Sequence, residues 1–226
     1  MNKTEINFII FDMDGVLVDS ETAITLASME SLAEWGVNAK VEDFKEFTGM
    51  GDDKFIGGTA QKYGVEYDLK MKARAYEIYL EKADERVHVF AWSKPLIEKL
   101  HAEGYKLAVA SASDYVKVKR NIECIGVSPD IFDAVVTGSD VERKKPFPDI
   151  FLKAFDKVKT KTGDADIDVS RTLVCEDALS GVIAARAAGM NCAAVTTSFG
   201  AEKLTEAGAH YVTDDLMSVT DVFGQK

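Results

Sequence analysis

The chain has 226 residues, of which 46% are hydrophobic and 29% charged, a balance typical of a folded globular protein with a sizeable core. The formal net charge is −11, which argues against nucleic acid as a partner, because proteins that bind nucleic acid usually present a basic surface. The same charge would repel a phosphorylated substrate, so a phosphate site in this chain requires local cations or a metal ion.

The cysteine content and the lack of long apolar runs indicate the cellular compartment in which the protein is expected. Cys124, Cys175 and Cys192 form no Cys-X-X-Cys pair, and their odd number predicts free thiols in a reducing cytoplasm. No stretch approaches the roughly 18 apolar residues of a membrane span. Residues 1–5 lack the layout of a signal peptide. We therefore expect a cytoplasmic protein without a membrane partner, and a monomer is our default.

The first predicted strand ends in two carboxylates. The run Ile6–Phe11 is short, continuous and apolar, which predicts a buried central strand, and Asp12, Asp14 and Gly15 follow it. Alternate residues of a strand share a face, so both carboxylates can reach one ligand. A bound proton or a divalent cation such as Mg²⁺ would offset their repulsion. Asp-X-Asp-Gly is also an ordinary turn sequence, so this stretch alone does not decide between a turn and a site.

The block of residues 20–85 is compatible with helices and contains no convincing strand. Ser20 is a candidate N-cap for a first helix, which is expected to stop at Gly36. Residues 48–53 form a glycine-rich turn. The helices predicted in the block cover residues 20–35, 41–47, 54–63 and 69–83. Because the block interrupts the alternation of strands and helices, we predict an inserted helical subdomain.

Strands and helices alternate from about residue 87 to the end of the chain. The predicted strands are 106–110, 134–136, 172–175, 192–195 and 211–212, and the helices between them are 94–103, 115–124, 150–158 and 178–188. Such strands pair in parallel through right-handed crossovers. The predicted fold class is therefore α/β, a doubly wound, Rossmann-like parallel sheet with an inserted α-helical cap. Residues 1–16 and 88–226 are the predicted core and residues 17–87 the predicted cap.

Polar side chains follow several predicted strands at the carboxyl ends, where open α/β sheets bind ligands. These residues are Asp12, Asp14, Ser111, Glu176 and Asp177, with Lys144 and Lys145 in a loop between. Carboxylates can hold Mg²⁺, and a hydroxyl with the backbone N–H groups after it, as at Ser111 and Ala112, can donate to phosphate oxygens. A lysine can neutralise a nucleophilic carboxylate and a phosphate together. Phosphoryl transfer needs these groups, because it depends mostly on positioning and charge stabilisation.

Four motifs, in order, resemble those of a known family. They are the stretches 11–21 (FDMDGVLVDSE), 110–113 (ASAS), 145–151 (KPFPDIF) and 176–190 (EDALSGVIAARAAGM). With them the chain resembles phosphatases of the haloacid dehalogenase (HAD) superfamily that carry a helical cap after the first strand, in the β-phosphoglucomutase-like (CbbY-type) branch. The second motif is weak alone, whereas the other three are specific. The resemblance spans nearly the whole chain.

The resemblance implies catalytic roles for four residues. Asp12 would be the nucleophile that forms an aspartyl-phosphate. Asp14 would be the general acid that protonates the leaving oxygen and then the base that activates water. Ser111 would hold the phosphate group. Lys145 matches the family lysine better than Lys144, because it directly precedes Pro146.

The resemblance also implies a Mg²⁺ site and explains several neighbouring residues. Asp12, the backbone carbonyl of Asp14 and Asp177 would bind the cation, with Glu176 ligating directly or through water. Asp19 is interpreted as a structural turn residue. The glycines after the first and last motifs are interpreted as backbone devices: Gly15 lets the chain leave the strand, Gly181 serves helix packing and Gly189 closes a helix.

The cap is where the resemblance weakens. Its specificity loop corresponds to residues 48–53, from which Gly49, Met50, Gly51 and Asp52 would contact the substrate. Sugar phosphomutases of the branch carry an arginine where this chain has Asp52 and a histidine where it has Ile24. Both departures weaken the mutase interpretation, and the acidic loop disfavours multiply charged substrates.

The predicted function is therefore Mg²⁺-dependent hydrolysis of a small phosphorylated metabolite, such as a sugar phosphate, through an aspartyl-phosphate. A phosphomutase of the β-phosphoglucomutase type stays as the alternative. Dehalogenase relatives lack the second aspartate of the first motif, so Asp14 argues against that activity. A receiver domain of a signalling protein also combines aspartates, a hydroxyl and a lysine around Mg²⁺. Receivers are shorter, lack a cap insertion and carry the phosphorylated aspartate on a middle strand, which disfavours this third interpretation.

Overall fold

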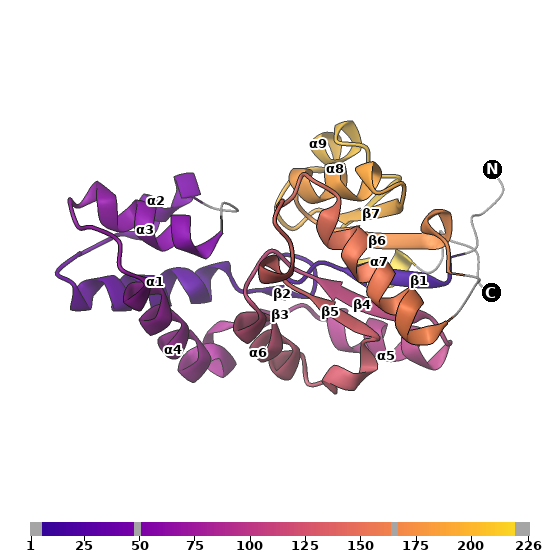
Figure 1. Cartoon of the computed structure of the whole chain (residues 1–226), viewed down its shortest axis with the longest axis horizontal. Helices are drawn as coiled ribbons and strands as arrows, with labels where there is room; N and C mark the ends of the chain where they lie inside the picture. Colours follow the sequence, from indigo (N-terminus) through magenta and orange to yellow (C-terminus); the bar gives the residue numbers. More distant parts are fainter. Residues whose placement is uncertain (1–5, 48–50, 164–166, 220–226) are drawn as a thin grey trace.

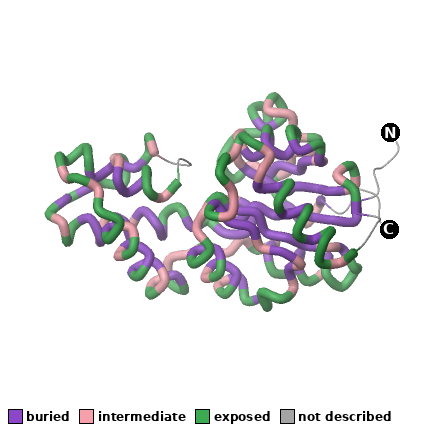
Figure 2. The backbone as a smooth tube through the Cα atoms, in the orientation of Figure 1, coloured by how far each residue is buried: buried purple, intermediate pink, exposed green. Residues whose placement is uncertain are grey.

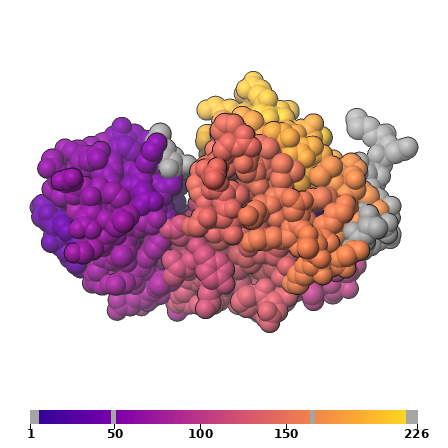
Figure 3. Space-filling view, viewed as in Figure 1, coloured from indigo at the N-terminus to yellow at the C-terminus, as the bar shows by residue number. Residues whose placement is uncertain are grey.

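The computed structural model describes residues 6–47, 51–163 and 167–219, and these residues form two lobes (Figure 1). Residues 20–47 and 51–87 make up a helical lobe, drawn in purple at the left, and the other described residues make up the core at the right. Figure 3 shows the two lobes as adjacent masses. The helical lobe lies beyond the end of the core at which the chain leaves β1 (Phe8–Phe11) for β2 (Val18–Asp19) (Figure 1).

The core contains a six-stranded parallel sheet in the order β5-β4-β1-β6-β7-β8. Its strands are β1 (Phe8–Phe11), β4 (Lys106–Ala110), β5 (Ala134–Val136), β6 (Thr172–Glu176), β7 (Asn191–Val195) and β8 (Tyr211–Thr213). The strand order reverses at β1, which pairs with β4 on one side and β6 on the other. The predicted doubly wound α/β fold is confirmed. A crevice for ligands is expected at such a switch point, outside the carboxyl ends of the strands.

Alternate residues of β1 pack against the two helical layers, as the period of a strand requires. Ile9 and Phe11 belong to the apolar cluster that includes α5 and α6, whereas Phe8 and Ile10 belong to the cluster that includes α7, α8 and α9. These helices are α5 (Ser93–Ala102), α6 (Tyr115–Ile125), α7 (Asp149–Thr162), α8 (Leu179–Ala187) and α9 (Ala201–Glu206). In Figure 2 the central strands are buried between these layers. Among these five helices, α9 is the one that the sequence did not predict, and its Leu204 is fully buried.

The helical lobe has its own apolar core. Its helices are α1 (Glu21–Glu34), α2 (Val41–Phe44), α3 (Asp52–Lys62) and α4 (Leu69–Arg86), with a 3₁₀ turn over Lys45–Phe47. Buried side chains from all four helices, among them Leu32, Phe44, Ile56 and Tyr79, form a cluster separate from the two clusters of the sheet. The predicted helices of this block are therefore confirmed.

The chain crosses between the lobes through a short antiparallel ribbon that the sequence did not predict. β2 (Val18–Asp19) pairs with β3 (His88–Val89). Trp92 Nε1 donates a 2.9 Å hydrogen bond to the carbonyl of Val16, and Ser93 Oγ donates a 2.6 Å bond to the carbonyl of Leu17. These contacts tie both crossings to the core. The predicted boundaries, 16/17 and 87/88, lie beside this ribbon.

The prediction that Ser20 caps the first helix through its side chain is wrong. Ser20 occupies the N-cap position of α1 but makes no side-chain cap hydrogen bond. Its hydroxyl donates instead to the carboxylate of Asp14. Asp19 was interpreted as a turn residue, but it lies in β2, and its Oδ1 accepts a 3.2 Å hydrogen bond from the N–H of Glu21 at the start of α1.

The cysteines and the length of the helices test two expectations from the sequence. All three cysteines are free, as predicted; Cys175 and Cys192 are buried and Cys124 is half-buried. Within the described ranges, every helix is too short or too polar to cross a membrane.

Candidate active site

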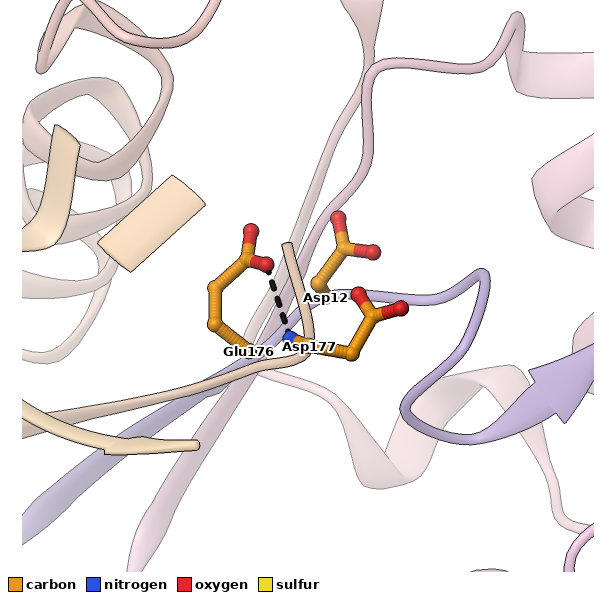
Figure 4. Close-up of side chains that lie close together, drawn as sticks. All are labelled: Asp12, Glu176 and Asp177. Carbon is orange, nitrogen blue, oxygen red and sulfur yellow. Dashed lines mark hydrogen bonds between the residues drawn. The ribbon is translucent and has the colours of Figure 1, made fainter. Parts of the chain in front are cut away.

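Three carboxylates meet at the carboxyl ends of β1 and β6. Asp12 directly follows β1, Glu176 is the last residue of β6 and Asp177 follows it, and one carboxylate oxygen from each lies within 4.8 Å of the others. Figure 4 shows the three carboxylates gathered at the point where the two chain segments run side by side. All three residues are buried, with exposed fractions of 7%, 0% and 4%. The parallel register of β1 and β6 brings the two strand ends together.

Lys145 joins this group from the loop before α7. Its ammonium lies 2.6 Å from Asp12 Oδ1 and 2.5 Å from Glu176 Oε1. The other oxygen of Glu176 accepts hydrogen bonds from the N–H groups of Asp177 (2.9 Å) and Ala178 (3.0 Å). Lys144 points elsewhere and donates to the carbonyl of Gly138. The preference for Lys145 over Lys144 therefore agrees with the geometry.

Two glycines leave space for the acidic side chains. A β-carbon at Gly15 would overlap the carboxylate of Asp177, and a β-carbon at Gly181 would overlap that of Glu176. Gly15 has φ +80°, so it also turns the chain away from β1, as predicted. The interpretation of Gly181 as a helix-packing glycine was incomplete, because its main neighbour is the buried carboxylate.

Asp14 lies outside the group of three carboxylates and has its own set of donors. Ser113 Oγ donates to Asp14 Oδ2 at 2.8 Å, Ser20 Oγ donates to Oδ1, and Lys117 Nζ lies 3.1 Å from Oδ1. Ser111 Oγ is 3.5 Å from Asp14 Oδ2. Protein donors therefore contact both oxygens of the Asp14 carboxylate, which leaves its backbone carbonyl as the better candidate for a metal ion.

The two aspartates have opposite electrostatic environments. Burial raises the pKa of Asp12 to about 7, with Lys145 opposing and Glu176 and Asp14 adding to the rise. Burial, together with Glu176 and Asp12, also raises the pKa of Asp177 well above its usual value. Burial acts on Asp14 too, but the charge of Lys117 and the hydrogen bonds from Ser20 and Ser113 outweigh it, so its pKa is lowered.

Lys117 and Ser113 are site residues that the sequence prediction missed. Lys117 lies on α6 and is 4% exposed. A signal existed, because Lys117 falls on the same helical face as Val118, Ile122 and Ile125, where an apolar residue is expected. Ser113 is the second serine of the Ala-Ser-Ala-Ser motif, of which only Ser111 and Ala112 were selected.

The remaining predicted site residues come from the stretch before and at the start of α3 and from the stretch after β4. Gly49 and Met50 are outside the described residues. Gly51 and Ala112 are exposed, and Asp52, the first residue of α3, accepts a hydrogen bond from Tyr76 of α4. Ile24 is buried in the core of the helical lobe.

A polar seam, defined here as Asp52, Asp53, Lys72, Tyr76 and Asp114, joins the helical lobe to the core. Lys72 lies 2.7 Å from Asp114 and 3.0 Å from Asp53. The hydroxyl of Tyr76 donates to Asp114 at 3.1 Å as well as to Asp52. Asp114 precedes α6 and is three residues beyond Ser111, so the seam runs directly beside the candidate active site.

Comparison with known proteins gives one family and several relatives. The model of the haloacid dehalogenase-like hydrolase family matches residues 9–195. Protein SUPPRESSOR OF QUENCHING 1, chloroplastic, from Arabidopsis thaliana is 38% identical over 225 residues, which cover 96% of this chain and 21% of that protein. The chain therefore spans about a fifth of the length of that relative.

Two further proteins are similar over most of both lengths. (DL)-glycerol-3-phosphatase 2 from Arabidopsis thaliana is 30% identical over 201 residues, covering 84% of this chain and 79% of that protein. The crystal structure of CbbY from Rhodobacter sphaeroides in complex with phosphate has a TM-score of 0.79 and 24% sequence identity, and covers 95% of this chain and 96% of that one. At this identity the structural match establishes a common fold.

Proposed function

Because the chain belongs to the haloacid dehalogenase-like hydrolase family, we propose that it is a Mg²⁺-dependent phosphatase that forms an aspartyl-phosphate on Asp12. The substrate class that we propose is a small phosphorylated metabolite, with sugar phosphates as the first candidates. One observation carries the proposal: Asp12 lies against Lys145 and within reach of Glu176 and Asp177 at the switch point of the sheet. Phosphatase-named relatives support the same activity.

The residues present fit a magnesium ion. Mg²⁺ prefers oxygen ligands, and Asp12, Glu176 and Asp177 offer three carboxylates in a buried cluster. Burial, reinforced by the neighbouring carboxylates, raises the pKa values of Asp12 and Asp177, and a bound cation would favour the ionised form of both. The backbone carbonyl of Asp14 is a further candidate ligand. When bound, the cation neutralises phosphate charge and assists in-line displacement.

In the first proposed step, the two aspartates act as nucleophile and general acid. An oxygen of Asp12 attacks phosphorus, the bond from phosphorus to the ester oxygen breaks, and a proton from Asp14 passes to that leaving oxygen. Lys145 and Ser111 supply the positive charge and the hydrogen bond that hold the phosphoryl group. The lowered pKa of Asp14 favours its carboxylate, but a phosphate dianion beside it raises that pKa and so favours proton uptake on substrate binding.

The second step regenerates the enzyme. Asp14, now a carboxylate, takes a proton from water, whose oxygen attacks the phosphorus of the aspartyl-phosphate. The bond between Asp12 and phosphorus breaks, and inorganic phosphate and the Asp12 carboxylate are released. The hydrogen bonds from Ser113 and Ser20 hold Asp14 near the same reaction axis in both steps.

We also propose that residues 17–87 act as a cap over a core of residues 1–16 and 88–226. In this proposal the loop at 48–53, with Gly51 and Asp52, faces the leaving group of the substrate. The seam is acidic, since three aspartates accompany one lysine, and this charge disfavours a second phosphate group. It therefore favours a phosphatase over a phosphomutase. The cytoplasmic location and the monomeric state stay predictions.

A panel of phosphorylated metabolites tests the function. We expect phosphate release that requires Mg²⁺, stops on chelation and is lost in Asp12→Asn. Glucose 1-phosphate with a bisphosphate primer belongs in the panel, because efficient isomer formation without phosphate loss would contradict the phosphatase and favour the mutase. A phosphorylated Asp12 that persists for hours would instead favour the receiver interpretation.

A further inference from the structure

Each aspartate of the first motif has its own buried lysine. Lys145 lies 2.6 Å from Asp12, and Lys117 lies 3.1 Å from Asp14. The two lysine side chains are 9% and 5% exposed, so neither is a solvated surface residue. The family resemblance accounts for Lys145 and assigns nothing to Lys117.

Lys117 is held from three sides. Its ammonium contacts Asp14 Oδ1 and donates a 3.2 Å hydrogen bond to Ser113 Oγ, which itself donates to Asp14 Oδ2. It also lies 5.9 Å from the ring centre of Tyr79 on α4, within the range of a cation–π contact. The ammonium and the serine thus occupy both oxygens of the Asp14 carboxylate and fix its plane.

Packing alone does not account for a lysine at this position. The neighbouring buried residues of α6, Val118 and Ile122, are apolar, and an apolar side chain would fill the same space. Replacement of a buried ion pair by apolar residues is often neutral or stabilising, so such a pair is a weak device for stability. A role in holding the Asp14 carboxylate would explain why a charged residue is buried at position 117.

The same face of α6 also contacts the helical lobe. One turn beyond Lys117, Asn121 Oδ1 accepts a 2.5 Å hydrogen bond from the hydroxyl of Tyr79. Tyr79 therefore touches Asn121 through its hydroxyl and Lys117 through its ring. The ammonium of Lys117 is fixed by residues of both lobes. Among the described residues, Lys145 has polar and ring contacts with Asp12, Glu176 and Phe151, which all belong to the core.

We propose that Lys117 is a positioning residue that holds the Asp14 carboxylate in the orientation from which it exchanges protons with the leaving oxygen and with water. The inference rests on the proposed function. Lys117 acts through Asp14 and need not contact the substrate. Its effect should therefore depend on Asp14 and on how much the leaving group needs a proton.

The kinetic test compares two kinds of leaving group. Lys117→Met should lower kcat/KM for the best alkyl phosphate of the panel by about 10²-fold, the scale of a small misplacement of a reacting group. The loss should be much smaller for p-nitrophenyl phosphate, whose leaving group needs no proton. Lys117→Arg should recover part of the activity, and Lys119→Met, an exposed lysine of the same helix, should match wild type. An equal loss for both substrates would overturn the proposal.

A double-mutant cycle tests whether Lys117 acts through Asp14. In an Asp14→Asn background, Lys117→Met should cause almost no further loss of kcat/KM, whereas a full additional 10²-fold loss contradicts the proposal. If Lys117→Met alone does not fold, the comparison is made with Lys117→Arg, and the double variant should fold better because it buries no unpaired charge.

Unfolding measurements, which need no substrate, distinguish failure of this inference from failure of the proposed function. Absence of phosphate release from every substrate by the wild type would refute the phosphatase. The unfolding midpoints of Lys117→Met, Asp14→Asn and their double variant still report on the pair. Coupling predicts that the double variant unfolds at a higher temperature than the sum of the two shifts implies. Additive shifts would overturn the assigned pairing.

Discussion

The core and the helical lobe use charged residues in different ways. In the core, Asp12, Glu176 and Asp177 converge in a buried cluster that Lys145 compensates only in part. In the seam, Lys72 and Asp114 pair with each other, and their side chains are 17% and 31% exposed. Both groups place three carboxylates around one lysine, but the core keeps its excess negative charge where solvent cannot screen it, whereas the seam keeps its excess within reach of water.

This difference suggests that the core carries out the reaction and that the seam influences which substrate binds. Uncompensated buried carboxylates cost free energy unless a cation or proton accompanies them, so they mark the place where a ligand is needed. Exposed ion pairs contribute little to stability and can be exchanged without loss of the fold. We therefore expect substitutions in the core to affect turnover and metal binding, and substitutions in the seam to affect substrate affinity.

The largest expected effect is the loss of the nucleophile. Asp12→Asn keeps the shape of the side chain but removes the charge that attacks phosphorus, so kcat should fall by about 10⁴-fold or more. Steady-state phosphate release with Mg²⁺ measures this effect. The variant should remain folded, because burial already raises the pKa of Asp12 to about 7 and an amide is cheaper to bury than a carboxylate. Retention of a tenth of the activity would show that another residue is the nucleophile.

A second core prediction concerns the space behind the metal ligands. Gly181→Ala would drive a methyl group into the carboxylate of Glu176, which must then move away from Lys145. We expect Mg²⁺ affinity to fall by about 10- to 100-fold, as for other losses of support to a ligand. The measurement is the Mg²⁺ dependence of phosphate release.

Gly200→Ala is the matched control, because its added methyl group would meet no atom within 4 Å and its φ is −68°. Equal Mg²⁺ affinity in Gly181→Ala and the control would mean that Glu176 does not support the cation.

Sequence reasoning reached the core site because strand ends are easy to locate. Apolar runs that stop at Asp12 and at Glu176 mark two strands, and the parallel fold brings their ends to one edge. Lys117 was missed because a lysine on an amphipathic helix is normally solvent-exposed, and its burial depends on where Tyr79 of the other lobe packs. The hydrogen bond of Ser20 was also not predictable from local sequence. Its hydroxyl donates to the carboxylate of Asp14 and therefore does not cap α1.

Short elements were beyond the reach of periodicity. β2 and β3 have two residues each, and α9 has six, so none shows a full repeat of its hydrophobic pattern. The seam was also unpredictable, because Lys72 and Asp114 are 42 positions apart and belong to different lobes. These ion pairs form only when α4 lies beside the start of α6.

The buried charge of the core should also make the stability of the protein depend on pH. The pKa of Asp12 is raised from 3.8 to about 7 in the folded protein, so between these values the folded state binds more protons than the unfolded state. Stability without metal should therefore fall as the pH rises through this range. A cation at the cluster reverses the penalty and, at about 100 times its Kd, adds about 2.7 kcal/mol.

Thermal unfolding with and without Mg²⁺ measures this effect. The rise in unfolding temperature caused by Mg²⁺ should be larger at about pH 8 than at about pH 5, because Asp12 is mostly ionised only at the higher value. Sodium chloride at equal ionic strength is the control. An equal shift at both values would mean that the cation binds away from Asp12.

The smallest expected effect comes from the seam. Lys72→Met removes the charge that pairs with Asp53 and Asp114, and the partial exposure of these groups limits the change in the free energy of unfolding to less than about 1 kcal/mol. Three aspartates then remain beside the site without their lysine, so we expect KM for a phosphorylated substrate to rise while kcat stays within about twofold, because uniform binding is lost rather than transition-state contact. Lys70→Met, an exposed lysine of the same helix, is the control. A fall in kcat comparable to that of the core variants would contradict the assignment of turnover to the core and of affinity to the seam. It would place Lys72 among the groups that act on the transition state.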